Sequence, residues 1–255
     1  MNASFDVVIV GGGVTGAAVG YGLAKRGVKT CLVDAVPTFS RASRANMGLI
    51  WCQSKALGCP QFVRWGFASS RAYGNLAAEL KELSGIDTGY APTGGIIPCL
   101  GEAELEARAQ FIEKLRAETE DGTYPASVLS RKELEGMLPK VPFGPEVSGG
   151  IWSDMDGYVD PLHLMFAFRK SFVRLGGTLF AGERVSEVKP SGKGYAVVCG
   201  GRTLECGKAV LAAGLGVRKL AAQLGTDIPV FPNKSQVMLL ERIPADVLPI
   251  PLLGI

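Results

Sequence analysis

The chain has 255 residues, 47% of them hydrophobic, which is enough to build a sizeable core in one large domain or in two interwoven ones. Its 27 lysine and arginine residues against 24 acidic residues give a formal charge of +3, which is too small to indicate nucleic acid as a main partner. The apolar N-terminal stretch lacks a basic region, contains Asp6 and is interrupted by glycines, so we expect neither a signal peptide nor a transmembrane segment, and we expect a cytoplasmic location.

The N-terminal segment has the pattern of a dinucleotide-binding unit. The run FDVVIV is short, apolar and rich in β-branched residues, as in a central parallel strand. Gly11, Gly13 and Gly16 then form G-x-G-x-x-G, which allows a tight turn, close approach of the backbone to a pyrophosphate and close packing of the next helix. That helix, expected over residues 14–25, directs its first N–H groups at the phosphates, and Asp34 ends the strand KTCLVD where a carboxylate can accept ribose hydroxyls. This order of elements predicts a bound dinucleotide; a glycine-rich turn used only for packing is the alternative.

After this unit the chain departs from a nicotinamide-type domain, which would continue with alternating strands and helices. An irregular segment covers residues 43–60 instead, and a long helix is expected over residues 60–83. The strand GGIIPCL, an amphipathic helix over residues 102–118 and a stretch rich in proline and glycine up to Gly150 follow. We interpret these residues as an inserted second domain, which favours FAD over a nicotinamide cofactor.

The pattern of the first domain returns at DGYVDPLHL. Asp160 is the expected N-cap of a helix that begins at Pro161 and stops at Gly176, before the strand TLFAG. Three short runs, RVSEVKP, GYAVVCG and RTLECG, predict an antiparallel meander. The run KAVLAAGLG predicts a buried strand followed by a small-residue turn, where the backbone can again approach a nucleotide.

The two patterns interleave along the chain. The expected fold class is α/β, with a Rossmann-like FAD-binding domain and an incomplete α+β substrate domain. We assign residues 1–88 and 151–225 to the first domain, and residues 89–150 and 226–255 to the second.

These segments in combination resemble the FAD-dependent amino-acid oxidase and dehydrogenase superfamily, which includes glycine oxidase, sarcosine oxidase and D-amino-acid dehydrogenase. The matching stretches are VVIVGGGVTGAAVGYGLAKRGVKTCLVD, ASRANMGLIW, DGYVDPLHL, GGTLFAGERVSEV and AVLAAGLG. Within the superfamily, SRANMGLIWCQSKALGCPQF is most similar to the flavin subunits of opine oxidases, of hydrogen cyanide synthase and of related hydroxyproline dehydrogenases. The resemblance implies oxidation of the C–N bond of a D-amino acid, glycine-type or opine-type substrate by hydride transfer to FAD.

The resemblance also implies roles for individual residues. The three motif glycines would bind the FAD pyrophosphate, and Asp34, in place of the more usual glutamate, would bind the adenosine ribose. Ser43 and Arg44 match positions that contact phosphate and flavin, and Val185 matches one that binds adenine through backbone atoms. The remaining expected contacts lie on the strand along the isoalloxazine and at the second approach to the dinucleotide: Asn46, Met47, Gly48, Ala212, Ala213 and Gly214.

The implied chemistry demands position and electrostatics more than an acid or a base. The one histidine, His163, is therefore interpreted as a structural or surface residue, and no catalytic residue is assigned. Trp51 and Lys55 could line the substrate cavity, with a core tryptophan and a solvated lysine as the alternative. Cys52 and Cys59 are spaced too widely for a zinc pair, so we expect no metal site, and the six scattered cysteines are expected to be reduced thiols.

Members of the superfamily usually continue further, with substrate-domain strands, an arginine for the substrate carboxylate and a glycine-rich return segment beside the reduced flavin. Here FPNKSQVMLLERIP is expected to start a substrate-domain strand, and no return segment follows, so the C-terminal third is expected to be missing. A truncated, non-catalytic FAD- or ADP-binding remnant or assembly subunit is therefore the alternative to an intact flavoenzyme, and a nicotinamide dehydrogenase is a third. The expected partners are a small amino-acid-like substrate and subunits that accept electrons, through which the chain could become peripheral to a membrane.

Overall fold

The computed structural model describes residues 3–35, 42–119, 122–234, 242, 244 and 246–253. The chain divides into two compact units. Unit 1 comprises Met1–Asn46, Glu79–Thr88 and Pro161–Val237, and unit 2 comprises Met47–Ala78, Gly89–Asp160 and Met238–Ile255. These geometric units differ from the functional division expected from the sequence, since unit 2 includes residues 47–78 and 151–160.

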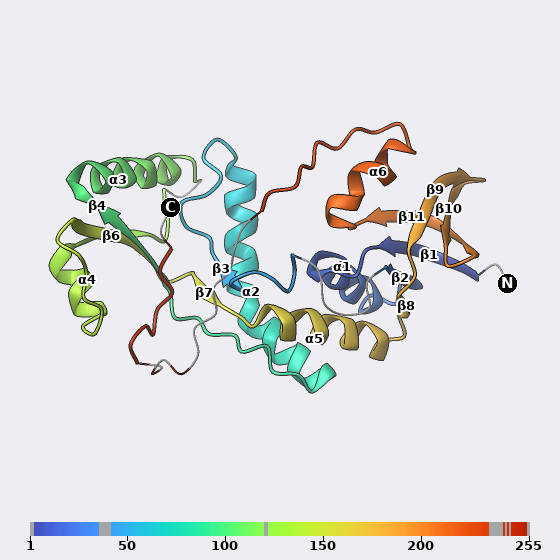
Figure 1. Ribbon diagram of the computed structural model, residues 1–255, viewed down its shortest axis with the longest axis horizontal. Coiled ribbons are helices and arrows are strands. Elements are labelled where there is room, and N and C mark those ends of the chain that lie inside the picture. Colours follow the sequence, from blue (N-terminus) through green and yellow to red (C-terminus); the bar gives the residue numbers. More distant parts are fainter. Residues whose placement is uncertain are drawn as a thin grey trace. The chain divides into compact units, whose positions relative to one another are not determined.

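Unit 1 is built on a six-stranded sheet with the order β8-β2-β1-β11-β10-β9 (Figure 1). The parallel strands are β8 (Thr178–Ala181), β2 (Thr30–Asp34), β1 (Ala3–Val10) and β11 (Arg202–Leu211), and β10 (Gly194–Cys199) and β9 (Val185–Ser191) continue the sheet as an antiparallel meander. The carboxyl ends of β1, β2 and β11 therefore lie at one edge of the sheet, where an α/β fold of this kind binds its ligand.

Both faces of this sheet are covered. Helices α1 (Val14–Ala24) and α5 (Pro161–Arg174) lie side by side, and α5 contributes Phe172 to a cluster with Ile9 and Leu32 of the sheet (Figure 1). A second cluster joins Val8, Val33 and Leu204 of the parallel strands to Val188 and Val197 of the meander and to Leu220, which lies in the helix after β11. Each such buried aliphatic or aromatic side chain contributes about 1.5–3 kcal/mol. The 3-10 turn η1 (Gly214–Gly216) and α6 (Val217–Ala222) follow β11.

Unit 2 has a three-stranded antiparallel sheet with the order β4-β6-β5. Its elements are β3 (Leu49–Ile50), α2 (Pro60–Ser84), β4 (Gly95–Leu100), α3 (Gly101–Ala117), β5 (Ser127–Ser130), α4 (Arg131–Met137), β6 (Val147–Ser153) and β7 (Gly157–Tyr158). Helix α2 belongs to unit 2 up to Ala78 and to unit 1 from Glu79. Ile112 and Leu115 of α3 pack on Ile97 and Ile151 of the sheet, and β3 pairs with β7. These contacts hold β3 and the loop behind it.

The α/β class and the predicted helices are confirmed, with ends that differ from the expected ones by one or two residues. The run RTLECG and the first part of KAVLAAGLG differ from expectation: they form one continuous strand, β11, because residues 202–206 pair with β10 and residues 204–211 pair with β1. The stretch rich in proline and glycine up to Gly150, for which the sequence predicts no particular element, contains β5, α4 and the start of β6. The strand expected at FPNKSQVMLLERIP lies largely outside the described residues. Within the described part of the chain, no helix is both long and apolar enough to cross a bilayer.

Candidate functional site

The glycine-rich turn after β1 and the end of β11 meet at the carboxyl edge of the unit 1 sheet. Gly11 has φ +107°, and a Cβ on it would lie 2.4 Å from the carbonyl oxygen of Ala212. A Cβ on Gly16 would lie 1.9 Å from the carbonyl oxygen of Gly11. The Ala212 N–H donates to the Val10 carbonyl at 2.8 Å. The two turns expected to approach a dinucleotide are therefore adjacent, and only glycine leaves the backbone room to do so.

The N-terminus of α1 is held by a residue distant in sequence. The Val14 N–H donates to Ser43 Oγ at 3.0 Å, and the same oxygen lies 2.9 Å from the position of a Cβ on Gly13. A hydroxyl that accepts one hydrogen bond still has its own O–H to donate. Ser43 can therefore stabilise the helix terminus and also donate to a phosphate oxygen at the same place.

Asp34 ends β2 with its side chain buried. A Cβ on Gly12 would lie 2.6 Å from Asp34 Oδ2, so the carboxylate sits directly over the glycine-rich turn. The same oxygen lies 3.6 Å from Nη1 of Arg169 on α5, and both side chains are more than 90% buried. Sequence reasoning identified Asp34 but missed Gly12 and Arg169. Gly12 occupies a variable position of the motif, and Arg169 lies on a helix assigned only to packing.

The structure shows fewer contacts for the other unit 1 residues that the sequence analysis names. Arg44 and Asn46 are exposed, and the Asn46 side-chain amide donates to the Ala42 carbonyl at 3.0 Å. Val185 begins β9 opposite Cys199. Ala213 and Gly214 follow Ala212 into η1 and are half-buried and exposed, respectively. His163 is exposed on α5.

The expected flavin-side strand begins in unit 2. Met47 is 64% exposed, whereas Gly48 is buried and its carbonyl accepts a hydrogen bond of 2.9 Å from the Val159 N–H. The backbone is thus fixed from Gly48 into β3, and Met47 projects from its start.

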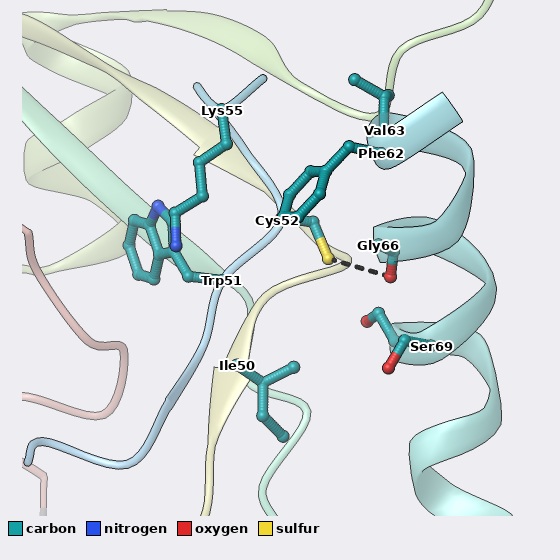
Figure 2. Close-up of a pocket in the computed structure, with 9 residues that line it drawn as sticks. Ile50, Trp51, Cys52, Lys55, Phe62, Val63, Gly66 and Ser69 are labelled. Atoms are coloured by element: carbon teal, nitrogen blue, oxygen red, sulfur yellow. Dashed lines mark hydrogen bonds between the residues drawn. The ribbon is translucent and has the colours of Figure 1, made fainter. Parts of the chain in front are cut away.

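The loop behind β3 and the first turns of α2 enclose a pocket of about 180 Å³ (Figure 2). Figure 2 shows the Lys55 side chain running toward the indole of Trp51, and Phe62 at the start of α2. The Cys52 thiol donates to the Gly66 carbonyl at 3.5 Å. This volume is below the range of about 300–1,000 Å³ that is typical of ligand pockets, so the pocket has no room for a dinucleotide. The complete lining is Ile50, Trp51, Cys52, Lys55, Phe62, Val63, Gly66, Ser69 and Ser70.

A buried carboxylate anchors this loop. Asp156, only 1% exposed, accepts hydrogen bonds from the Cys52 N–H at 2.5 Å and from the Gln53 side-chain amide at 2.8 Å. The same amide also donates to the Gly95 carbonyl at 2.9 Å. Burial raises the pKa of Asp156, while the two hydrogen bonds act in the opposite direction. The carboxylate therefore fixes the backbone beside the pocket.

The same loop holds strained backbone. Ser54 and Ala56, on either side of Lys55, have φ of +57° and +64°, which residues other than glycine rarely adopt. The Ser54 N–H donates to the Tyr124 hydroxyl at 3.0 Å, and that hydroxyl donates to the Cys52 carbonyl at 3.4 Å. Burial raises the pKa of Tyr124 to about 12, so the phenol stays protonated. Strain held by such anchors is typical of functional loops.

Three of the six cysteines, Cys31, Cys199 and Cys206, belong to one buried cluster of unit 1. All six thiols are free, and four of them, Cys31, Cys99, Cys199 and Cys206, are buried. Among the described residues, no cluster of three or more histidine, cysteine, aspartate or glutamate side chains could hold a metal ion.

The unit 1 residues fit the pyrophosphate and ribose of a dinucleotide. The turns at Gly11 and Ala212 leave space that larger side chains would fill. The N-terminus of α1 presents backbone N–H groups, and the buried carboxylate of Asp34 lies at the end of β2. These are the features that anion binding and ribose recognition require.

Comparison with known proteins agrees with this geometry. The family model described as "DAO: FAD dependent oxidoreductase" matches residues 6–254. The relatives include one of the subunits of opine oxidase from Agrobacterium tumefaciens, which is 35% identical over 238 residues, covering 93% of this chain and 63% of the relative. Hydrogen cyanide synthase subunit HcnC from Pseudomonas aeruginosa is 28% identical, covering 96% of this chain and 66% of the relative.

A solved structure gives the same result. The crystal structure of glycine oxidase from Geobacillus kaustophilus matches with a TM-score of 0.80 and 28% identity, covering 88% of this chain and 59% of that one. The chain spans about 63% of the length of the opine oxidase relative that it matches. Because the family model covers almost the whole sequence, this chain belongs to the DAO family of FAD-dependent oxidoreductases, whose cofactor is FAD.

Proposed function

We propose that this chain binds FAD and forms part of an enzyme that oxidises the C–N bond of an amino-acid-like substrate: a D-amino acid, a glycine-type amine or an opine. The observation that carries the proposal is the convergence of two close backbone turns, the α1 N-terminus and Asp34 at one edge of the sheet. The similarity to the opine oxidase relative and to glycine oxidase supports the substrate class.

In this proposal the unit 1 residues hold the dinucleotide. The N–H groups of the turn at Gly11, Gly13 and Gly16, with the helix dipole of α1, stabilise the negative charge of the pyrophosphate. Ser43 donates to a phosphate oxygen while it accepts from Val14, and Asp34 accepts the adenosine ribose hydroxyls.

The remaining cofactor residues approach the two rings. Arg44 contacts phosphate and flavin, and Val185 binds adenine through its backbone. The flavin-side strand and the turn after β11 supply the other contacts, which are Asn46, Met47, Gly48, Ala212, Ala213 and Gly214. Bound FAD supplies the hydride acceptor, so the chain itself needs to position the substrate and to exclude water.

We further propose that the unit 2 pocket receives the substrate carboxylate. Lys55 provides a positive charge beside a wall of apolar side chains, and the anchors at Asp156 and Tyr124 fix its position. An ammonium group beside apolar side chains binds a carboxylate through a charge-assisted hydrogen bond. It binds a neutral ligand of the same shape more weakly. Trp51 lines the pocket together with Lys55.

Substrate reduction of bound flavin tests the function. The purified chain is loaded with FAD and mixed without oxygen with an opine, glycine or a D-amino acid, and the visible flavin absorbance is followed. Bleaching by one of these compounds is the expected result. Stabilisation by FAD or ADP without bleaching by any of them would instead identify a non-catalytic nucleotide-binding protein.

Replacement of Lys55 tests the pocket. Lys55→Met should raise the half-saturating substrate concentration about tenfold or more, with a smaller effect on the maximal rate, because it removes a charge-assisted contact to the carboxylate. Lys114→Met, at an exposed lysine of α3, is the matched control and should leave both quantities unchanged. Equal behaviour of the two variants would exclude Lys55 from substrate binding.

Partner subunits are also part of the proposal. The opine oxidase relative and HcnC are both named as subunits, so we propose that this chain passes electrons to partner chains in the cytoplasm. Copurification of the tagged chain with other products of its own operon, together with faster reoxidation of the flavin in their presence, is the expected result. Reoxidation by oxygen alone at the full catalytic rate would refute it.

A further inference from the structure

Arg169 is unusual for its position in the fold. It lies on the face of α5 that also buries Met165, Phe168 and Phe172, and its side chain is only 9% exposed. Arginine is almost never fully buried unless a partner compensates its charge. A helix that served only to cover the sheet would carry an apolar residue here.

The guanidinium of Arg169 is directed at the acid that ends β2. Nη1 lies 3.6 Å from Oδ2 of Asp34, and that oxygen stands over Gly12 at the start of the glycine-rich turn. Three elements, β2, the β1–α1 turn and α5, therefore meet at one carboxylate. The lateral position of this carboxylate is limited by Gly12 on one side and by the guanidinium on another.

The distance determines what kind of contact this is. At 3.6 Å the pair attracts through charge but is too long for a normal N–H···O hydrogen bond. At this distance the positive charge of Arg169 stabilises the negative charge of the buried carboxylate, while Oδ2 does not use a lone pair in a hydrogen bond to Nη1. The contact with Arg169 therefore balances the charge of the carboxylate and does not itself use an acceptor position of Oδ2.

We propose that Arg169 is a positioning residue for Asp34, and that it sets how strongly the adenosine ribose hydroxyls contribute to cofactor affinity. The inference rests on the proposed ribose role of Asp34. Aspartate is one methylene shorter than glutamate, so its reach depends more on a neighbour that fixes its orientation. Arg169 does this from α5, which sequence motifs for dinucleotide binding do not include.

The test compares two ligands that differ in one hydroxyl. Dissociation constants of ADP and of 2′-deoxy-ADP are measured by calorimetry on the full chain. Their ratio reports the ribose contact, and a general loss of stability affects both constants alike. Wild type should discriminate by about tenfold or more, as expected for a hydrogen bond to a charged group. Arg169→Met should reduce the ratio to about threefold or less, and Arg169→Lys, which keeps the charge but not the planar head, should give an intermediate ratio.

The matched control lies on the same helix. Arg174 is exposed and donates to the Leu83 carbonyl at 3.1 Å, and Arg174→Met should keep the wild-type ratio. If Arg169→Met does not fold, Arg169→Gln replaces it under the same criterion. A wild-type ratio in the Arg169 variants would overturn the positioning role alone. A wild-type ratio near one would overturn the ribose role of Asp34, and with it this inference, while flavin reduction by substrate would remain a separate measurement.

Discussion

Replacing Gly16 with alanine is the most direct test of the close approach between β1 and α1. The added Cβ would stand 1.9 Å from the Gly11 carbonyl oxygen, whereas real Cβ contacts essentially never fall below 3.0 Å. The backbone must therefore move by at least about 1.1 Å. The helix cannot simply slide sideways, because the same Cβ would also stand 3.2 Å from Cβ of Ala212.

The cost of this movement should be large, because the obstacle is backbone and not the end of a flexible side chain. Overpacking in a tight core costs about 1–3 kcal/mol, and we expect the upper end of that range. For a chain of this size, about 3 kcal/mol lowers the thermal midpoint by about 6–12 °C. The turn that should hold the pyrophosphate also moves, so the stabilisation by FAD, about 2.7 kcal/mol at a hundredfold excess over Kd, should disappear.

Gly22→Ala is the matched control for this prediction. Gly22 lies on the same helix, and a Cβ there would meet only Nη1 of Arg26, at 3.7 Å. Alanine should stabilise the helix by about 0.5–1 kcal/mol. Thermal unfolding of both variants, with and without FAD, checks the pair of predictions. If Gly16→Ala unfolds at the wild-type temperature and still gains stability from FAD, the close approach is not what holds the turn.

Three further predictions concern Asp156, Tyr124 and the cysteines. Burial raises the pKa of Asp156, so the folded state binds the proton of this carboxyl group more tightly than the unfolded state does. The free energy of unfolding should therefore fall as the pH rises from about 3.8 through the raised pKa. Urea unfolding from about pH 4 to about pH 8 should show a smaller fall for Asp156→Asn than for the wild type, and parallel curves would contradict this. Tyr124→Phe leaves the Ser54 N–H without its acceptor and should reduce the free energy of unfolding by about 1–2 kcal/mol, measured in urea; a loss below about 0.3 kcal/mol would contradict an anchoring role. Cys59 is exposed and should be the thiol that reacts first with a disulfide reagent, so Cys59→Ser should remove the fast phase, and a persisting fast phase would contradict this. Burial raises the pKa of the slow thiols, to about 12 for Cys31 and to about 11 for Cys99 and Cys199.

The sequence predicts the elements at the dinucleotide edge because their signals are local. The glycines, the helix after them and the acid at the end of β2 lie close together in the chain, and each is required by backbone geometry or by charge. The bond between Gln53 and Asp156 joins residues 103 positions apart, so no spacing rule identifies it. The motif does not identify Gly12 for a similar reason. A side chain at this position would collide with the carboxylate of Asp34, which lies on the next strand and outside the motif.

Trp51 shows why two interpretations of one residue can both hold. A Cβ on Gly95 would lie 2.5 Å from the Trp51 ring, so the indole lies against the backbone of β4 and is 9% exposed, as a core residue would be. The same indole lines the pocket beside Lys55. Truncating Trp51 would leave a cavity against β4 and distort the pocket together, so its effect on activity could not separate packing from substrate binding. Lys55 is exposed and contributes little to the core, which makes it the residue whose replacement reports on the pocket alone.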